Sequence, residues 1–572
     1  MNILAYFRNI TTLWNVSKYR HFSAISCFVC KRVFRYIWIF NNNMIGKMRK
    51  ILVMVAALCA VGFVAWAQDD ENSGLECTSI VVGRLASTDG SVMTSHTCDG
   101  TSHTWVNIVP AKDHKPGSMT KIRKNWRKTK FVTDTAGIKI VGEIPQVAHT
   151  YSYVNTGYPS LNEKQVGIGE TTFTGPDTLI NKDAPLLIEE LCRLAMERCA
   201  TAREAVKLMG SLAEEYGYGD GGECLTVSDP KEVWQFEIVG VGKHKIGAAW
   251  AAQRIPDEHV GISANIPRIG KIDRSDTENF MASDNLEQVA IDNGLWDGKG
   301  DFVFWRVIVC SYAQGRNYRE REFRVFDLLA PSLGLKYGMD DFPFSVKPDS
   351  LVDVRKVMAL LRDTYEGTEW DMCKNWTIDV PEKDGVPAHK EMSPLANPWL
   401  TTPMRNTLNS IAPGVIDFRR TLAVAWCSYS TVIQSRSWLP DGIGGVCWYA
   451  VDNPAQSPRI PIFCGSTKLP AAFEKCGQRE YYPNSVLWEF RRANKLATLS
   501  WQKTKKEFTD NVLEMEAMTF DGLPELEAEY SKASGKKRAK LLNAYTAEIH
   551  DKCAARWKEL EAKYWSMFGR GF

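Results

Sequence analysis

The first 67 residues of the chain contain no aspartate or glutamate, although the 572-residue chain has 67 acidic residues. The charges in this leader are all basic: Arg8, Lys18, Arg20, Lys31, Arg32, Arg35, Lys47, Arg49 and Lys50. Residues 68–572 therefore hold 61 basic and 67 acidic side chains, a net charge of −6, whereas the whole chain carries +3. Because the excess of positive charge belongs to the leader alone, composition gives no support for nucleic-acid binding.

The apolar run of the leader is short for a membrane span. It covers 16 residues, 51–66, whereas a spanning helix needs about 20. Arg49 and Lys50 precede the run and the small-x-small sequence Ala65–Ala67 ends it, which is the three-part pattern of a secretory signal peptide. We therefore expect 48–67 to be a signal peptide; an uncleaved anchor is the alternative.

A signal peptide that starts 47 residues into a chain would be recognised poorly. Methionines stand at positions 44 and 48, directly before the basic start of the signal. We expect translation to begin at Met44 or Met48, so that 1–47 is an upstream extension of the reading frame. The mature protein is then exported and keeps no stable membrane anchor.

The chain also has little of what metal and nucleotide sites require. Its nine histidines are scattered without His-Glu-x-x-His spacing, and the twelve cysteines after the leader follow no ligand pattern. The glycine-rich stretch 217–222 lacks the Lys-Ser/Thr pair of a phosphate loop. We therefore expect neither a metal nor a cofactor.

Strand patterns dominate the chain after residue 76, and helical patterns dominate its end. The stretches that read as strands or hairpins are 77–87, 91–96, 166–173, 224–242, 247–265, 421–436 and 444–452. Helical spacing marks 184–215 and the charged tail from about 485, whereas 270–415 gives no clear pattern. Runs of strands followed by helices predict an α+β fold of stacked sheets with covering helices.

Cys77 begins the first predicted strand, straight after the short acidic stretch 68–76. If the chain is cut between Glu76 and Cys77, the thiol and a free α-amine belong to one residue. The thiolate is a nucleophile, and an α-amine has a reference pKa of about 7.7–8.0, so it serves as a base near neutral pH. This combination predicts an acyl-transfer enzyme, although an isolated cysteine at a strand start is more often a small buried residue.

Several motifs connect this cysteine to a known family. The segment 77–100 reads Cys-Thr, then Val-Gly, then Asp-Gly-Ser, and then a polar stretch that reaches Asp99. Four further blocks follow in order: 162–172, 216–240, 250–269 and 430–465. Together they resemble peptidase family C69, the dipeptidase A type of N-terminal nucleophile hydrolases, over about 77–500. The resemblance implies an αββα sandwich of two stacked antiparallel sheets covered by helices, with a helical C-terminal extension.

The resemblance also implies which side chains form the site. It makes Cys77 the nucleophile and, through its freed amine, the base. In the wider superfamily of penicillin V acylases and bile salt hydrolases, an arginine and an aspartate lie close to the nucleophile, and those positions fall on His96 and Asp99. The oxyanion asparagine corresponds to Asn265, and a second oxyanion position falls on Thr172.

His96 departs from the superfamily pattern, because a histidine stands where an arginine is expected. It either orients the thiol or is a hydrogen-bonded structural histidine. Asn265 similarly has a plain alternative as a turn residue before Pro267. A further, distal superfamily arginine has no clear counterpart, and Arg306 and Arg316 are the candidates.

The resemblance favours an exported cysteine dipeptidase, located in the periplasm or secreted by a bacterium. An amidase or acylase of N-acyl amides uses the same machinery, and a secreted binding protein without catalysis is a third reading. Dipeptides are the expected partners, nucleic acid is not, and self-association stays open. The predicted parts are 1–47 (extension), 48–67 (signal peptide), 68–76 (propeptide), 77–485 (catalytic domain) and 486–572 (helical extension).

Overall fold

The computed structural model describes residues 77–309, 316–339, 341–383, 386–478 and 480–570. The predictions for 1–47, 48–67 and 68–76 lie outside the described residues. Within the described ranges, no helix combines the length and the apolar character needed to cross a membrane.

The strand after Cys77 belongs to a seven-stranded antiparallel sheet. Its strands in spatial order are β16 (Ser345–Val346), β14 (Val260–Ser263), β1 (Ser79–Val82), β2 (Val92–Asp99), β19 (Cys427–Ser435), β20 (Val446–Val451) and β21 (Ile460–Phe463). The predicted hairpin is confirmed as β1–β2, with Asp89 accepting hydrogen bonds from Ser87 and Ser91 in its turn. The late strand β19 pairs with β2 along its length. Strands from the beginning and the end of the sheet-forming part of the chain are therefore neighbours at the centre of this sheet.

The second large sheet has eight strands. Their spatial order is β15 (Phe280–Ala282), β13 (Ala249–Ile255), β12 (Val233–Val239), β11 (Glu223–Ser228), β10 (Gly167–Thr172), β9 (Leu161–Asn162), β8 (Tyr153–Asn155) and β3 (Asn107–Val109). The predicted hairpin 224–242 corresponds to β11–β12, where Asp229 accepts the backbone N–H groups of Lys231 and Glu232 in the turn. Consecutive strands pair in sequence order from β8 to β13, which makes a simple antiparallel meander.

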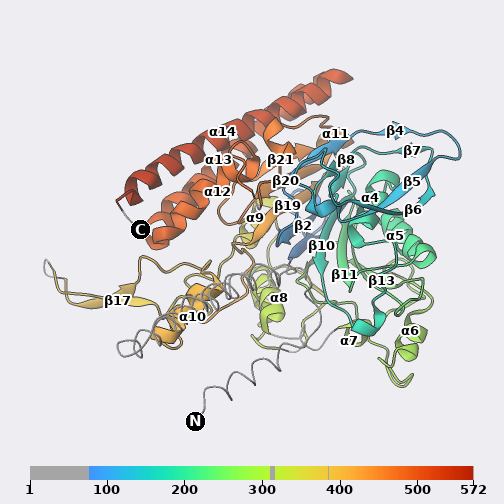
Figure 1. Ribbon diagram of the computed structural model, residues 1–572, viewed down its shortest axis with the longest axis horizontal. Coiled ribbons are helices and arrows are strands. Elements are labelled where there is room, and N and C mark those ends of the chain that lie inside the picture. The colour runs from blue at the N-terminus through green and yellow to red at the C-terminus, as the bar shows by residue number, and fades with distance from the viewer. Residues whose placement is uncertain (1–76, 310–315, 340, 384–385, 479, 571–572) are drawn as a thin grey trace, which may run out of the picture. The chain divides into compact units, whose positions relative to one another are not determined.

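The two sheets lie face to face, with β2 against β10 and β11 (Figure 1). The hydroxyls of Thr94 and Thr226 meet between the sheets at 2.7 Å. Gly169 on β10 lies so close to β2 that an added Cβ would stand 2.1 Å from the Ser95 carbonyl oxygen. Only glycine fits there, and this close approach brings side chains of the two sheets together near Cys77.

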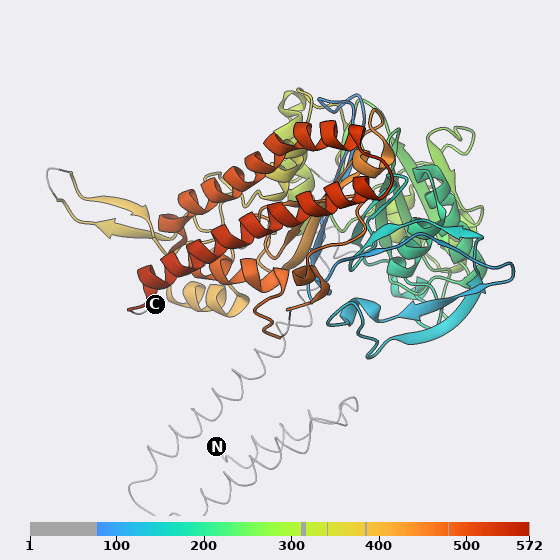
Figure 2. The same ribbon diagram turned by 90° about the horizontal axis from the view of Figure 1, so that it is seen from above.

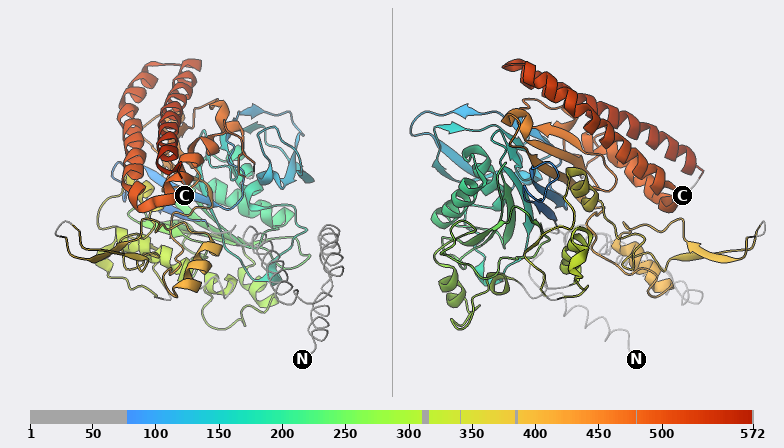
Figure 3. Two further views of the ribbon diagram at one scale, coloured as in Figure 1. Left: turned by 60° about the vertical axis from the view of Figure 1, so that its left-hand side comes forward. Right: turned by 180° about the vertical axis from the view of Figure 1, so that it is seen from behind.

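Helices cover the outer face of each sheet. On the second sheet lie α4 (Ile188–Arg198) and α5 (Ala202–Tyr216), as 184–215 predicted. The first sheet is covered by α8 (Arg316–Leu329) and α9 (Val354–Leu361), whose apolar residues share a core with β1. The order of layers is therefore helix, sheet, sheet, helix (Figure 3).

The C-terminal region is helical, as predicted. Its helices are α12 (Val486–Ala497), α13 (Trp501–Lys532) and α14 (Lys536–Phe568). The long pair α13 and α14 run side by side (Figure 2). Trp557 of α14 is fully buried between Phe490 and Phe508, and its indole N–H donates to Asn494 at 2.9 Å. These residues belong to the same apolar core as residues of β20 and β21, so the helices pack on the first sheet.

Short elements fill 270–415, where the sequence gave no clear pattern. Besides α8, α9, β15 and β16, they include α6 (Leu286–Asp292), α7 (Phe304–Ile308), α10 (Thr402–Ile411) and the hairpin β17 (Thr377–Val380) with β18 (His389–Met392). Elsewhere, small pieces are β4 (Lys112–Asp113) with β7 (His149–Thr150), β5 (Met119–Lys124) with β6 (Lys139–Pro145), and α11 (Asp441–Gly444). Few of these elements are long enough to show a helical or strand period in the sequence, which explains why the sequence did not predict them. The α+β prediction with stacked antiparallel sheets and terminal helices is confirmed.

Candidate active site

Cys77 lies just before β1, an inner strand of the first sheet, and beside the end of β2. The next residue, Thr78, forms a bridge with Thr97 and its backbone N–H donates to the Thr97 hydroxyl at 2.9 Å. The cysteine is buried, with 3% of its surface exposed. Burial and the nearby negative charge of Glu170 raise the pKa of the Cys77 thiol well above its usual range. A raised pKa favours the protonated thiol over the thiolate.

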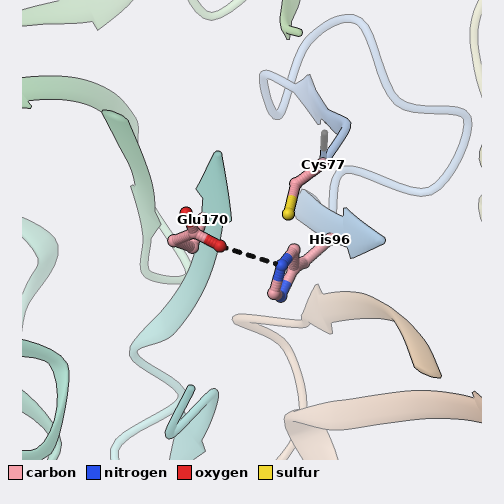
Figure 4. Close-up of side chains that lie close together, drawn as sticks. All are labelled: Cys77, His96 and Glu170. Atoms are coloured by element: carbon pink, nitrogen blue, oxygen red, sulfur yellow. Dashed lines mark ion pairs between the residues drawn. The ribbon is translucent and has the colours of Figure 1, made fainter. Parts of the chain in front are cut away.

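His96 and Glu170 face each other beside this sulfur from the two sheets. His96 Nε2 lies 3.2 Å from Glu170 Oε2, and both side chains are buried. The rings of Tyr158 and Tyr429 contact the imidazole edge-on and fix its plane. Figure 4 shows the sulfur and the carboxylate directed toward the imidazole. One ligand atom from each of Cys77, His96 and Glu170 lies within 4.8 Å of the other two, which makes this trio a candidate metal-ligand set.

Glu170 is the negative charge of the site. Burial alone would raise its pKa, but hydrogen bonds with His96 and Glu223 outweigh burial and lower the pKa of Glu170 to about 2. Burial and the charge of Glu170 raise the pKa of Glu223 well above its ordinary value. Of the two neighbouring carboxyl groups, Glu170 therefore ionises more readily and Glu223 keeps its proton more readily.

Thr172, two residues after Glu170 on β10, points its hydroxyl to that carboxylate. Its Oγ1 donates to Glu170 Oε1 at 2.9 Å. The hydroxyl has a single proton, so this bond directs it away from a second acceptor. The predicted oxyanion role of Thr172 stays a prediction, and the geometry shows instead a residue that orients Glu170.

Asn265 follows β14 in a left-handed conformation, with φ of 61°. Its side-chain N–H donates to the Thr172 carbonyl at 2.6 Å, and its Oδ1 accepts from Arg321 at 2.9 Å. Both bonds hold the amide plane rigidly, as an oxyanion donor requires.

Arg321 of α8 binds both sides of the site with its guanidinium. One nitrogen donates to the Cys77 carbonyl oxygen at 2.5 Å and to the Thr78 hydroxyl at 2.9 Å. The other donates to the Ala264 carbonyl at 2.7 Å and to Asn265. This fully buried fork fixes the distance between the cysteine and the asparagine.

Asp99 ends β2 close to the cysteine. Its carboxylate forms a buried ion pair with Arg420. A hydrogen bond with the Asp99 backbone lowers the pKa of the Cys77 thiol, but its effect is smaller than that of burial. Asp99 thus neighbours the sulfur through its backbone, while its side chain is directed to Arg420.

The structure brings the five predicted residues into one neighbourhood and adds two, Glu170 and Arg321. Arg306 is exposed and pairs with Asp341, and its assignment as the distal arginine stays a prediction. The Arg316 side chain lies outside the described residues. Glu170 had a signal in the sequence, because it is the only charged residue of the predicted strand that became β10, Gly167–Thr172. Arg321 had none, because it is one of many charges in α8.

A thiol grouped with an imidazole, a carboxylate and a rigid amide donor suits hydrolases that attack acyl carbons through cysteine. The family comparison leads to the same class, because the model of peptidase family C69 matches residues 76–514. The chain belongs to this family, and the resemblance read from the sequence is confirmed. The protein is thus a hydrolase of the peptidase type.

Bacterial relatives match most of the chain at low identity. A protein named probable dipeptidase from Latilactobacillus sakei is 24% identical over 472 residues, which is 77% of this chain and 88% of the relative. A probable dipeptidase from Salmonella dublin is 24% identical over 79% of this chain and 90% of its own. Dipeptidase A of Lactobacillus helveticus is 22% identical over 72% of this chain and 80% of its own.

Proposed function

We propose that this C69 peptidase is an exported dipeptidase whose nucleophile is the thiolate of Cys77. The observation that carries the proposal is the convergence of His96, Glu170, Asn265 and Arg321 on this one cysteine. The family match begins at residue 76, directly before it. The relatives named as dipeptidases supply the substrate class.

Self-cleavage between Glu76 and Cys77 activates the enzyme. Burial holds the thiol protonated while its nitrogen is part of a peptide bond. The cut creates an α-ammonium group beside the sulfur. Two unit charges about 4 Å apart attract by about 4 kcal/mol at an effective dielectric constant of about 20. That energy equals about three pKa units, so the cut favours the thiolate strongly.

Hydrolysis then proceeds in two stages. The thiolate attacks the scissile carbonyl carbon, and the Asn265 amide with a backbone N–H stabilises the oxyanion. The ammonium of Cys77 protonates the leaving amine, and a thioester with the N-terminal residue remains. The freed amine then takes a proton from water, which hydrolyses the thioester. His96, Asp99 and Arg321 act by positioning the cysteine and the amide.

In this proposal Glu170 favours substrates that have a free amino terminus. In a dipeptide the ammonium nitrogen lies about 2.5 Å from the attacked carbon. When that carbon is about 3–3.5 Å from the sulfur, the ammonium falls within reach of the Glu170 carboxylate, which lies within 4.8 Å of the sulfur. An N-acyl amide has no such charge and gains nothing from this carboxylate.

Export follows from the basic and apolar leader, with the periplasm or the outside of a bacterial cell as the destination. The layer order of helix, sheet, sheet, helix supports assignment to the N-terminal nucleophile hydrolases. In this proposal residues 48–67 are removed as signal peptide, 68–76 as propeptide, and 77–572 form the working enzyme.

The amino terminus of the purified mature protein tests the proposal. Mass spectrometry should find a chain that starts at Cys77. An activity assay should show that this chain hydrolyses dipeptides but not their N-acetylated forms. The uncut Cys77→Ser chain should stay uncut under conditions in which the wild type matures. A mature chain that starts at Gln68 and is inert toward a dipeptide panel would contradict the proposal. A chain that starts at Cys77 but prefers N-acyl amides would keep the proposed nucleophile and would change the proposed substrate from dipeptides to N-acyl amides.

A further inference from the structure

The trio Cys77, His96 and Glu170 combines the three donor types that zinc prefers. Thiolate sulfur, imidazole nitrogen and carboxylate oxygen all bind Zn²⁺ at about 2.0–2.3 Å. We propose that Zn²⁺ binds at this trio in the mature enzyme and inhibits it. The inference rests on the proposed cut before Cys77, because the cut supplies a fourth ligand.

The spacing of the three atoms fits one ion. Ligands at these bond lengths stand about 3.3–3.6 Å apart in a tetrahedral site. His96 Nε2 and Glu170 Oε2 already lie 3.2 Å apart, and all three ligand atoms lie within 4.8 Å of one another. A zinc ion therefore replaces the His96–Glu170 contact, and small rotations of the cysteine side chain complete three bonds.

The fourth ligand is the freed amine of Cys77. An amine and a thiolate on the same cysteine close a five-membered chelate ring around a metal ion. The mature chain thus offers N, S, N and O donors, a complete tetrahedral set, whereas the uncut chain offers three. We therefore expect the mature enzyme to bind zinc more tightly than the uncut chain.

Neighbouring groups already hold the ligands as metal sites require. The Thr172 hydroxyl occupies Glu170 Oε1, which directs Oε2 toward the ion. The rings of Tyr158 and Tyr429 contact the imidazole edge-on and fix its plane. Partners of this kind typically raise metal affinity by about 10–100-fold. One thiolate and one carboxylate also neutralise the two charges of the buried ion.

Zinc binding and catalysis use the same electron pairs. Binding releases the thiol and ammonium protons that remain on Cys77, and the sulfur and nitrogen lone pairs then bind the metal. No electrons are transferred and no further reactant is needed. The zinc-bound enzyme has neither its nucleophile nor its base, so hydrolysis stops until a chelator removes the ion.

The test measures metal binding apart from activity. Mature metal-free protein is titrated with Zn²⁺ by calorimetry, and with Co²⁺ while the sulfur-to-cobalt charge-transfer absorption is recorded. We expect one ion per chain, a charge-transfer band, inhibition that a chelator reverses, and no effect of Mg²⁺, which prefers oxygen ligands. The uncut Cys77→Ser chain should show no such band.

Variants locate the ligands. His96→Gln and Glu170→Gln should each weaken Zn²⁺ binding at least about 10-fold. The matched control is Glu237→Gln, a buried glutamate of β12 that hydrogen-bonds the backbone of Arg268 and Ile269, and it should bind zinc within about twofold of the wild type. Thermal unfolding of each apo variant verifies that it is folded.

Two outcomes overturn the zinc proposal: a missing charge-transfer band, or equal affinity in wild type and the folded His96 and Glu170 variants. Dipeptide hydrolysis by metal-free enzyme is measured in parallel. Activity without zinc binding refutes only the metal site. Tight zinc binding in a mature chain that hydrolyses no dipeptide refutes only the proposed function.

Discussion

The active-site region and the C-terminal helices bury their side chains in opposite ways. At Cys77 the buried groups are polar, and each is held by partners far away in sequence: Glu170, Asn265, Arg321. In α12–α14 the buried groups are mostly apolar, as around Trp557. Burial of apolar surface is non-directional, whereas buried polar groups need specific partners. Substitutions in the C-terminal helices should thus mainly lower the free energy of unfolding, and substitutions at the site should mainly lower the rate of hydrolysis.

The largest expected effect separates chemistry from folding. Cys77→Ser should lower the turnover of dipeptides by about 10⁴-fold or more, because the weaker nucleophile replaces the thiolate. The matched change Cys553→Ser, at a buried position of α14, should leave turnover per folded molecule unchanged. Initial rates divided by the concentration of folded protein measure both. Wild-type rates in the Cys77 variant would show that another residue is the nucleophile.

The reverse experiment acts on the helices. Trp557→Ala removes a buried ring and should lower the free energy of unfolding by about 3–5 kcal/mol, without changing turnover per folded molecule. Urea unfolding measures the loss. Trp565→Ala, at a position of α14 with 50% exposure, is the control and should cost little. Equal losses in the two variants would mean that α14 does not pack as described.

The sheet region should also carry pH dependence. Burial raises the pKa of Glu237 from 4.5 to about 7, although backbone hydrogen bonds oppose the rise. The folded state holds this proton more tightly than the unfolded state. The stabilisation that protonated Glu237 contributes is therefore complete below pH 4.5 and is lost as the pH rises to about 7. Over this range the free energy of unfolding decreases by about 3 kcal/mol.

Glu237→Gln should remove this decrease. Urea unfolding between pH 4.5 and 8 measures the slope in wild type and variant. Glu559→Gln, an exposed change in α14, is the matched control and should keep the wild-type slope. If the Glu237 variant also keeps that slope, the buried carboxyl group is not its source.

The smallest effect concerns positioning. Arg321→Lys keeps the charge but loses the fork that joins Cys77 to Asn265, so kcat should fall by about 10–100-fold, or about 1.4–2.7 kcal/mol. KM should change less, because Arg321 acts through other residues. Arg306→Lys, on an exposed arginine, should leave kcat unchanged. A loss confined to KM would place Arg321 in substrate binding instead.

Much of the fold could be predicted because its signals are local. The hairpin from Cys77, the pair α4–α5 and the helical tail each show their period within one stretch of sequence. The elements of 270–415 could not be placed, because most are too short to show a period. The sequence placed Cys77, His96 and Asn265 in one candidate site, and the structure brings these residues together, but the sequence analysis did not single out Glu170 or Arg321.

By itself the sequence determined the family, the position of the cysteine and the α+β class, because these depend on residue order and local pattern. Only the tertiary structure decided which charges meet. It paired His96 with Glu170 across two sheets and joined Cys77 to Asn265 through Arg321. Such contacts join strands and helices that are distant in the chain, and no local period encodes them.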